Sequence, residues 1–159
     1  MKELEGKVAL VTGAGQGVGE GIALALAAEG VNVVVTGRTE EKLVKTVTAI
    51  VDRGGKALAV VCNVKSSTDL ARAVNETISH FGRLNILVNN AQEVPNGLLN
   101  EVSDEVFTAG FESGPLATLR LMKLAYPHLK GDGCIVNLAS TVAKRWDMSG
   151  YGAYAAVKE

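Results

Sequence analysis

Val8-Ala-Leu-Val-Thr-Gly-Ala-Gly-Gln-Gly-Val-Gly19 is the stretch that decides the fold of this chain. An apolar run of strand length leads directly into a glycine-rich turn, and residues 20–28 continue as a small-residue segment of helical character. A helix N-terminus after such a turn offers free backbone N–H groups and the positive end of its dipole to a pyrophosphate. A turn without a ligand is the alternative, but the strand before it and the helix after it favour dinucleotide binding.

The same alternation of short apolar runs and helix-period segments continues along the chain. Strands are expected at residues 8–12, 32–36, 57–62, 85–89 and 134–138, and helices at residues 19–29, 40–52, 68–81 and 103–129. Because such βαβ repeats form parallel sheets with right-handed crossovers, we predict an α/β fold, a Rossmann-like doubly wound parallel sheet within one domain, residues 1–159. The nearly continuous apolar character of the strands indicates that helices cover both faces of the sheet.

Several residues give finer expectations about the helices and the core. Thr39, Ser66 and Ser103 are expected to cap helices, because each precedes acidic residues at a helix start. Pro115 predicts a kink or break in the last helix. The two cysteines, Cys62 and Cys134, lie in apolar runs and are expected to be buried free thiols rather than a disulfide.

Charge and hydropathy exclude two classes of partner. The formal net charge is -1, and the basic residues are scattered, so no basic surface for nucleic acid is expected. No run approaches the ~18 apolar residues of a membrane span, and the charged start lacks the apolar stretch of a secretory signal. We therefore expect no membrane association and a cytoplasmic location.

Motifs beyond the glycine turn give the chain a family resemblance. They are Gly13-x-x-x-Gly17-x-Gly19, Asn89-Asn-Ala91 after the fourth expected strand, Ser140 after the fifth, and Tyr154-x-x-x-Lys158. In order and spacing these motifs resemble the short-chain dehydrogenase/reductase family, and the resemblance covers the whole chain. It implies an oxidoreductase that transfers a hydride between a nicotinamide dinucleotide and a small-molecule alcohol or carbonyl substrate, and that forms a homo-oligomer, a dimer or tetramer. The implied cofactor contacts are Gly13, Gln16, Gly17, Val18, Gly19, Arg38, Asn63, Val64, Asn90, Tyr154 and Lys158.

The end of the second expected strand favours NADP over NAD. An acidic residue at this point would accept the ribose hydroxyls of NAD, whereas the chain has Arg38, whose guanidinium suits a phosphate. A solvated loop charge is the alternative interpretation of Arg38. Family members often have a further basic residue where this chain has Gln16. Asn63 stands where they usually have an aspartate, and its amide oxygen can still accept a hydrogen bond from adenine.

The catalytic group implied by the resemblance is Ser140, Tyr154 and Lys158. Tyr154 and Lys158 are four residues apart, so a helix places them on one face. A phenol titrates near ~10, and an adjacent ammonium favours its phenolate, which makes such a pair a usable general acid and base. Ser140 would hydrogen-bond the substrate oxygen; Thr141 is an alternative hydroxyl but fits the pattern less well. Tyr151 has no lysine four residues on.

Two positions depart from the family pattern. Gly114 stands where the family commonly has an asparagine that helps hold a water for proton relay, and Gln92 replaces the glycine of the Asn-Asn-Ala-Gly motif. Because Gly114 supplies no side chain, we expect hydride transfer to remain possible and proton delivery to be slowed or rerouted. Gln92 should instead carry a cost if the backbone there needs a positive φ or a close approach to the cofactor. A dinucleotide-binding module or subunit without turnover is therefore the alternative function.

The chain reaches Glu159 one residue after Lys158, whereas the resemblance implies further helix, further strands and a segment that closes over the substrate. The sheet is therefore expected to be incomplete at its C-terminus. The chain is either a truncated piece of an enzyme or a natural fragment that docks on a partner, and an inert fragment that folds only in an oligomer is a third possibility. Loops 92–100 and 141–150 should border the substrate pocket. Trp146 and Met148 either line this pocket or only pack against their local neighbours.

Overall fold

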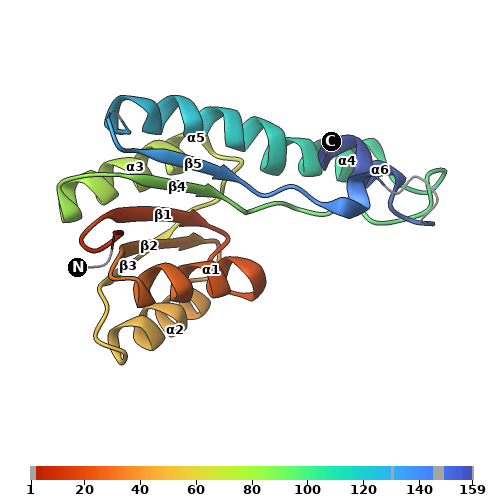
Figure 1. Cartoon of the computed structure of the whole chain (residues 1–159). Coiled ribbons are helices and arrows are strands. Elements are labelled where there is room, and N and C mark those ends of the chain that lie inside the picture. Colours follow the sequence, from red (N-terminus) through yellow and green to blue (C-terminus); the bar gives the residue numbers. More distant parts are fainter. Residues whose placement is uncertain (1–2, 130, 145–148, 159) are drawn as a thin grey trace.

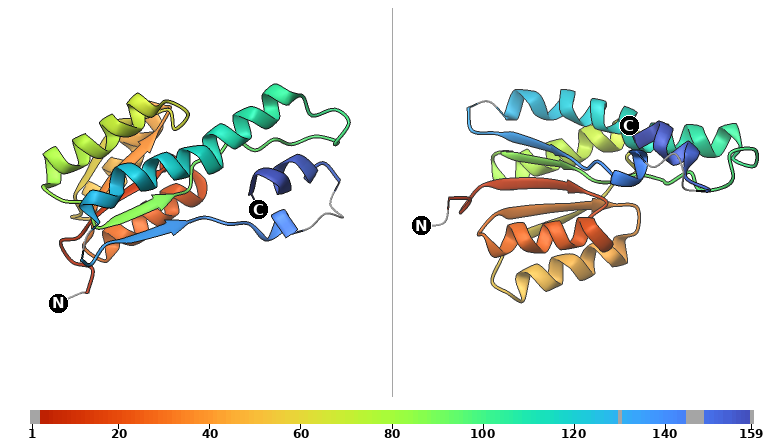
Figure 2. Two further views of the ribbon diagram at one scale, coloured as in Figure 1. Left: turned by 90° about the horizontal axis from the view of Figure 1, so that it is seen from above. Right: turned by 45° about the vertical axis from the view of Figure 1, so that its right-hand side comes forward.

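A parallel five-stranded sheet forms the centre of the protein, for which a computed structural model describes residues 3–129, 131–144 and 149–158 (Figure 1). The strand order is β3-β2-β1-β4-β5. The strands are β1 (Val8–Thr12), β2 (Asn32–Gly37), β3 (Ala57–Val61), β4 (Ile86–Asn89) and β5 (Cys134–Asn137), all paired in parallel. Figure 2 shows the twist of this sheet from two further directions. The predicted Rossmann-like fold is confirmed.

Helices cover both faces of the sheet (Figure 1). The helices α1 (Gly17–Ala28) and α2 (Glu40–Val51) lie on one face, and α3 (Ser67–Phe81) and α5 (Ala117–Ala125) lie on the other. Alternate residues of each strand point to opposite faces, so the sheet separates two apolar cores. Leu10 packs with the α3 and α5 residues, whereas its neighbours Ala9 and Val11 pack with those of α1 and α2.

The order of the strands creates a crevice at one end of the sheet. From β1 the chain proceeds outward through β2 and β3, and then crosses back to place β4 on the other side of β1. The connections that leave β1 and β4 therefore diverge to opposite faces, although their strands are neighbours. Ligands of open parallel sheets bind at this point, outside the carboxyl ends of the strands.

The last predicted helix is divided by a π-helical turn. It consists of α4 (Asp104–Phe111), the π-helix Glu112–Leu116, α5 and a 3-10 turn, Tyr126–His128. Pro115 lies inside the π-helix. Proline lacks an N–H and clashes with the carbonyl four residues earlier, and the wider π turn relieves both problems. The expected interruption is therefore present as a π turn rather than an end of the helix.

Two of the three predicted caps are confirmed. Ser66 accepts a hydrogen bond from the N–H of Asp69, and Ser103 accepts one from the N–H of Val106. The prediction for Thr39 is wrong, because its side chain makes no cap hydrogen bond. Negative charge in the first turn of α2, from Glu40 and Glu41, remains available to stabilise that helix end.

The strand β5 is an exception to the predicted burial of the strands. All four of its residues are exposed, including Cys134, which was expected to be buried; Cys62 is buried as predicted, and both thiols are free. In the described part of the chain, β5 pairs with β4 alone and forms the edge of the sheet. The apolar sequence of β5 correctly indicated a strand, but the side chains of a strand are buried only where other elements cover them.

A short helix, α6 (Gly152–Lys158), follows a 3-10 turn, Thr141–Lys144. It lies against α4 and the π-helix (Figures 1 and 2). Among the described residues, no helix has the length and apolar character needed to cross a bilayer.

Candidate functional site

The glycine-rich turn after β1 has a backbone that only glycine suits. Gly13 and Gly17 have φ angles of +64° and +57°, in the left-handed region. Gly19 is restricted by space instead: a Cβ atom there would lie 2.3 Å from the carbonyl oxygen of Gly13. The turn thus packs its backbone closely against the first turn of α1, whose N-terminal N–H groups can bind an anion.

Hydrogen bonds from the loop after β4 hold this turn in place. Asn90 Nδ2 donates to the carbonyl oxygens of Thr12, at 2.8 Å, and of Gly13, at 3.3 Å. The backbone N–H groups of Asn90 and Ala91 both donate to Thr12 Oγ1, at 3.0 Å. Thr12 Oγ1 in turn donates to the carbonyl of Val88. Asn90 therefore fixes the shape of the glycine turn, in addition to any contact it makes with a ligand.

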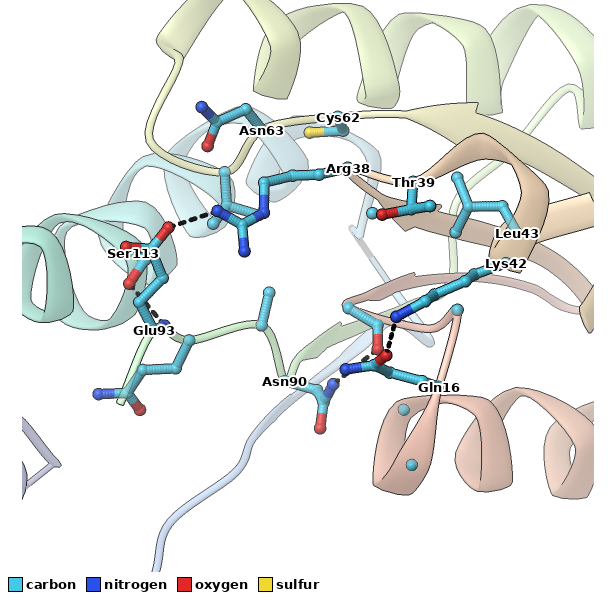
Figure 3. Close-up of a pocket in the computed structure, with 18 of the residues that line it drawn as sticks. Gln16, Arg38, Thr39, Lys42, Leu43, Cys62, Asn63, Asn90, Glu93 and Ser113 are labelled. Atoms are coloured by element: carbon cyan, nitrogen blue, oxygen red, sulfur yellow. Dashed lines mark hydrogen bonds and ion pairs between the residues drawn. The ribbon is translucent and has the colours of Figure 1, made fainter. Parts of the chain in front are cut away.

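A cavity of about 370 Å³ lies at the crevice, bordered by the glycine turn and by the ends of β2, β3 and β4 (Figure 3). Nine of the eleven residues predicted to contact the cofactor line this cavity. These are Gly13, Gln16, Gly17, Val18, Gly19, Arg38, Asn63, Val64 and Asn90. The other two predicted contacts, Tyr154 and Lys158, do not line this cavity.

The end of the cavity beside β2 and α2 has one basic group that the sequence analysis did not identify, in addition to Arg38. Lys42, in the first turn of α2, donates to Gln16 Oε1 (Figure 3). It thus brings a positive charge to the position where Gln16 itself supplies none. The spacing from Arg38 to Lys42 could have suggested this, because a loop residue and the following first turn lie close together.

Glu93 is a second residue that sequence reasoning missed. Arg38 Nη1 lies 2.6 Å from Glu93 Oε1 (Figure 3). Lys65 Nζ lies 3.3 Å from Glu93 Oε2. The N–H of Glu93 also donates to Ser113 Oγ, at 2.8 Å. Among the described residues that line the cavity, Glu93 is the only acidic one. Fifty-five positions separate it from Arg38, so no local pattern could show their contact.

Asn63 is partly committed to its own loop. Its Oδ1 accepts from the N–H of Lys65, at 3.1 Å, and its backbone N–H donates to Asp69 Oδ2, at 2.9 Å. The oxygen expected to contact adenine thus already stabilises a turn, although a second lone pair remains. The adjacent Cys62 also lines the cavity, and burial raises the pKa of its thiol to about 11, so it stays neutral at physiological pH.

A second cavity, of about 310 Å³, adjoins the first, and the two share Ala91 and Gln92 in their walls. Lys158 lines this second cavity together with Gly114 of the π-helix. The side chain of Lys158 is half-buried, and desolvation lowers the pKa of its ammonium below the usual value. The predicted reacting lysine therefore faces a space that adjoins the candidate cofactor site.

Tyr154 and Ser140 line neither of these two cavities. The ring of Tyr154 packs edge-on against that of Tyr151, with centroids 6.1 Å apart. Ser140 Oγ accepts a hydrogen bond from the N–H of Val142, at 3.3 Å, so its hydroxyl hydrogen remains available to another acceptor. Trp146 and Met148, expected near the substrate, lie outside the described residues.

Comparison with known proteins identifies the family. The family model described as short chain dehydrogenase matches residues 7–159. The chain belongs to the short-chain dehydrogenase family. Members of this family are oxidoreductases, as the resemblance implied. The short chain dehydrogenase mdpC of Emericella nidulans is 36% identical over 156 residues, which cover 98% of this chain and 59% of that protein.

Solved short-chain dehydrogenase structures have the same fold and bind nicotinamide dinucleotides. A short chain dehydrogenase from Burkholderia cenocepacia, in complex with NADP, has a TM-score of 0.93 and 34% identity, over 98% of this chain and 64% of that one. A 7α-hydroxysteroid dehydrogenase complexed with NADH has a TM-score of 0.91 and 30% identity, over 98% and 61%. This chain thus spans about three fifths of the length of these relatives.

Proposed function

We propose that the whole protein transfers a hydride between NADP(H) and an alcohol or carbonyl substrate. The observation that carries the proposal is the positive charge at the end of β2. Arg38 and Lys42 border the cavity there, whereas an NAD site typically has an acidic residue that accepts the ribose hydroxyls. The glycine turn supplies N–H groups and a helix dipole for the pyrophosphate. The nicotinamide would supply the hydride when bound.

The residues of the cavity fit such a cofactor. A Cβ atom at Gly17 would meet nothing within 4 Å, so this part of the turn is open to the approach of a ligand. Gln16, Val18, Asn63 and Val64 border the same space and would contact the sugars and the adenine. This agreement supports dinucleotide binding; the preference for NADP rests on Arg38 and Lys42.

The chemistry is assigned to Tyr154, Lys158 and Ser140. In the reducing direction, the phenol of Tyr154 would give its proton to the substrate oxygen, and the Ser140 hydroxyl would donate a hydrogen bond to that oxygen as charge develops. Lys158, one helical turn from Tyr154, would hold the nicotinamide ribose and favour the phenolate that remains. Segments beyond Glu159 would complete the substrate pocket.

Arg38→Gln is expected to weaken NADPH binding by about tenfold or more, because it removes a charge-assisted hydrogen bond to the phosphate. Binding of NADH should change little. Glu93→Gln should have the opposite effect and tighten NADPH binding, because the carboxylate occupies Arg38 and repels the phosphate. Fluorescence titration of the whole protein with each cofactor measures both effects.

Arg53→Gln is the matched control, since Arg53 is exposed beyond the end of α2 and does not line the cavity. It should leave both affinities unchanged. Equal loss of NADPH and NADH affinity in Arg38→Gln would contradict the assignment of Arg38 to the phosphate. Tighter NADH than NADPH binding by the unsubstituted protein would overturn the NADP preference itself.

We further propose that the protein forms a homo-oligomer. Exposed aromatic and aliphatic side chains lie on α4, on α5 and on the 3-10 turn after α5, and such a surface favours association. They are Phe107, Phe111, Leu119 and Tyr126. Sedimentation equilibrium of the whole protein should show a dimer or tetramer at micromolar concentration, and a monomer throughout would contradict the proposal.

A dinucleotide-binding protein without turnover is the second candidate. Gly114 favours it, because the π-helix offers no side chain to the cavity at that position. Steady-state assays with NADPH and a panel of carbonyl compounds separate the two candidates. Saturable NADPH binding without oxidation of the cofactor by any of them would support the second.

A further inference from the structure

The side-chain amide of Gln92 is buried without a protein partner. Its Nε2 atom is shielded from solvent and has no hydrogen-bond partner among the described residues. The same holds for Asn89 Oδ1, although Asn89 Nδ2 donates to Asn137 Oδ1, at 2.8 Å. A buried donor and a buried acceptor without partners cost roughly 1–3 kcal/mol each. Such groups usually mark a position where water or a ligand is held.

Both residues border the second cavity, together with Lys158. At about 310 Å³, this cavity has room for several water molecules. Its walls supply the donor on Gln92, the acceptor on Asn89 and the ammonium of Lys158, and a bound water needs two to four such polar groups. The bond between Asn89 and Asn137 uses only Asn89 Nδ2, so Asn89 Oδ1 and Gln92 Nε2 are both left without a protein partner among the described residues.

Gly114 is what gives Gln92 its position. A Cβ atom on Gly114 would lie 2.9 Å from Gln92 Nε2 and 3.0 Å from Gln92 Cδ. The two residues therefore share one space, and any side chain at position 114 would displace the amide. The Gln92 amide therefore reaches this part of the cavity from the loop after β4, at a place where Gly114 of the π-helix supplies no side chain.

We propose that Gln92 is a positioning residue for proton supply to Tyr154 and Lys158. Its amide, with Asn89 Oδ1, holds water that hydrogen-bonds the Lys158 ammonium. After Tyr154 gives its proton to the substrate oxygen, Lys158 donates a proton to the phenolate and receives one from this water, and the water regains a proton from bulk solvent. This inference rests on the proposed function and names the residue that performs the step for which Gly114 offers no side chain.

The test compares Gln92→Met with the unsubstituted whole protein. Methionine keeps nearly the same volume but removes the amide, so kcat should fall by about tenfold or more. This is less than the ~10²-fold or greater loss expected when a general acid or base itself is removed. The KM for NADPH should not change. The solvent deuterium isotope effect on kcat should rise, because proton delivery becomes the slow step. The Tm should stay the same or rise, since a buried polar group without a protein partner is lost.

Thr118→Val is the matched control, because Thr118 lines the same cavity and valine keeps its shape. It should leave kcat and the isotope effect unchanged. An unchanged kcat and isotope effect in Gln92→Met would overturn the inference while leaving the proposed function intact. Absence of turnover in the unsubstituted protein would overturn the proposed function, and the inference with it.

A second pair of variants keeps the inference testable if Gln92→Met folds poorly. Gln92→Gly should lower kcat, and adding Gly114→Asn should restore most of the loss, because the Cβ atom that carries the new carboxamide would lie 2.9 Å from the present position of Gln92 Nε2. Gly114→Asn alone should lower kcat, since its side chain meets Gln92. Failure of the double variant to recover kcat above that of Gln92→Gly would overturn the inference.

Discussion

Tyr154→Phe in the whole protein is expected to lower kcat by about a thousandfold, the middle of the range for a lost general acid. Phenylalanine lacks only the hydroxyl, so its ring can keep the edge-on packing against Tyr151, with centroids 6.1 Å apart, and α6 should remain folded. NADPH affinity should fall by no more than about tenfold, which corresponds to one neutral hydrogen bond. Single-turnover kinetics and a parallel NADPH titration measure the two quantities.

Tyr151→Phe is the matched control for this prediction. It makes the same chemical change three residues earlier, just before α6, in the partner of the same ring pair. Because Tyr151 has no lysine four residues on, its hydroxyl is not expected to exchange protons with the substrate. Equal losses of kcat in the two variants would show that the ring pair matters for packing alone and would remove Tyr154 from its catalytic role.

Gly19→Ala is expected to abolish most dinucleotide binding and to destabilise the fold. Its Cβ would lie 2.3 Å from the carbonyl oxygen of Gly13 and 2.5 Å from Asn90 Nδ2. A backbone oxygen cannot rotate away, so the turn must move, and overpacking of this kind costs about 3 kcal/mol of unfolding free energy. Moving the turn also misplaces the N–H groups for the pyrophosphate, which should weaken binding at least about tenfold.

Gly21→Ala, two residues further along α1, provides the control. A Cβ atom there would meet nothing within 4 Å. Alanine is the better helix former, so this variant should raise the unfolding free energy by about 0.5 to 1 kcal/mol and leave binding unchanged. Urea denaturation and NADPH titration test both variants. Wild-type affinity in Gly19→Ala would mean that the turn does not hold the cofactor closely.

Local sequence was sufficient to predict the sheet and the position of the candidate cofactor cavity. The apolar runs around Leu10 and Leu87 form strands as predicted, and both residues are buried. The glycines at positions 13 and 17 adopt the positive φ angles that the turn requires. A parallel sheet with this connectivity must then have a crevice beside the turn. The π turn at Pro115 and the caps at Ser66 and Ser103 are equally local.

Contacts between distant loops could not be predicted in this way. Glu93 reaches Arg38 and Lys65 because the loop after β4 faces the ends of β2 and β3 across the crevice. The error at Cys134 has a similar origin, since an apolar strand can be central or at an edge, and only its neighbours decide which.

Gln92 and Gly114 show the division most clearly. The sequence by itself determined that each departs from the family pattern, and it also determined the fold, the glycine turn and the Tyr154–Lys158 spacing, because these depend on local backbone geometry and on apolar periodicity. Only the tertiary structure decided that the two departures belong together, by placing the Gln92 amide against the space that Gly114 leaves beside Lys158. Which side chains share one space depends on how the loops pack, and packing is a property of the whole fold.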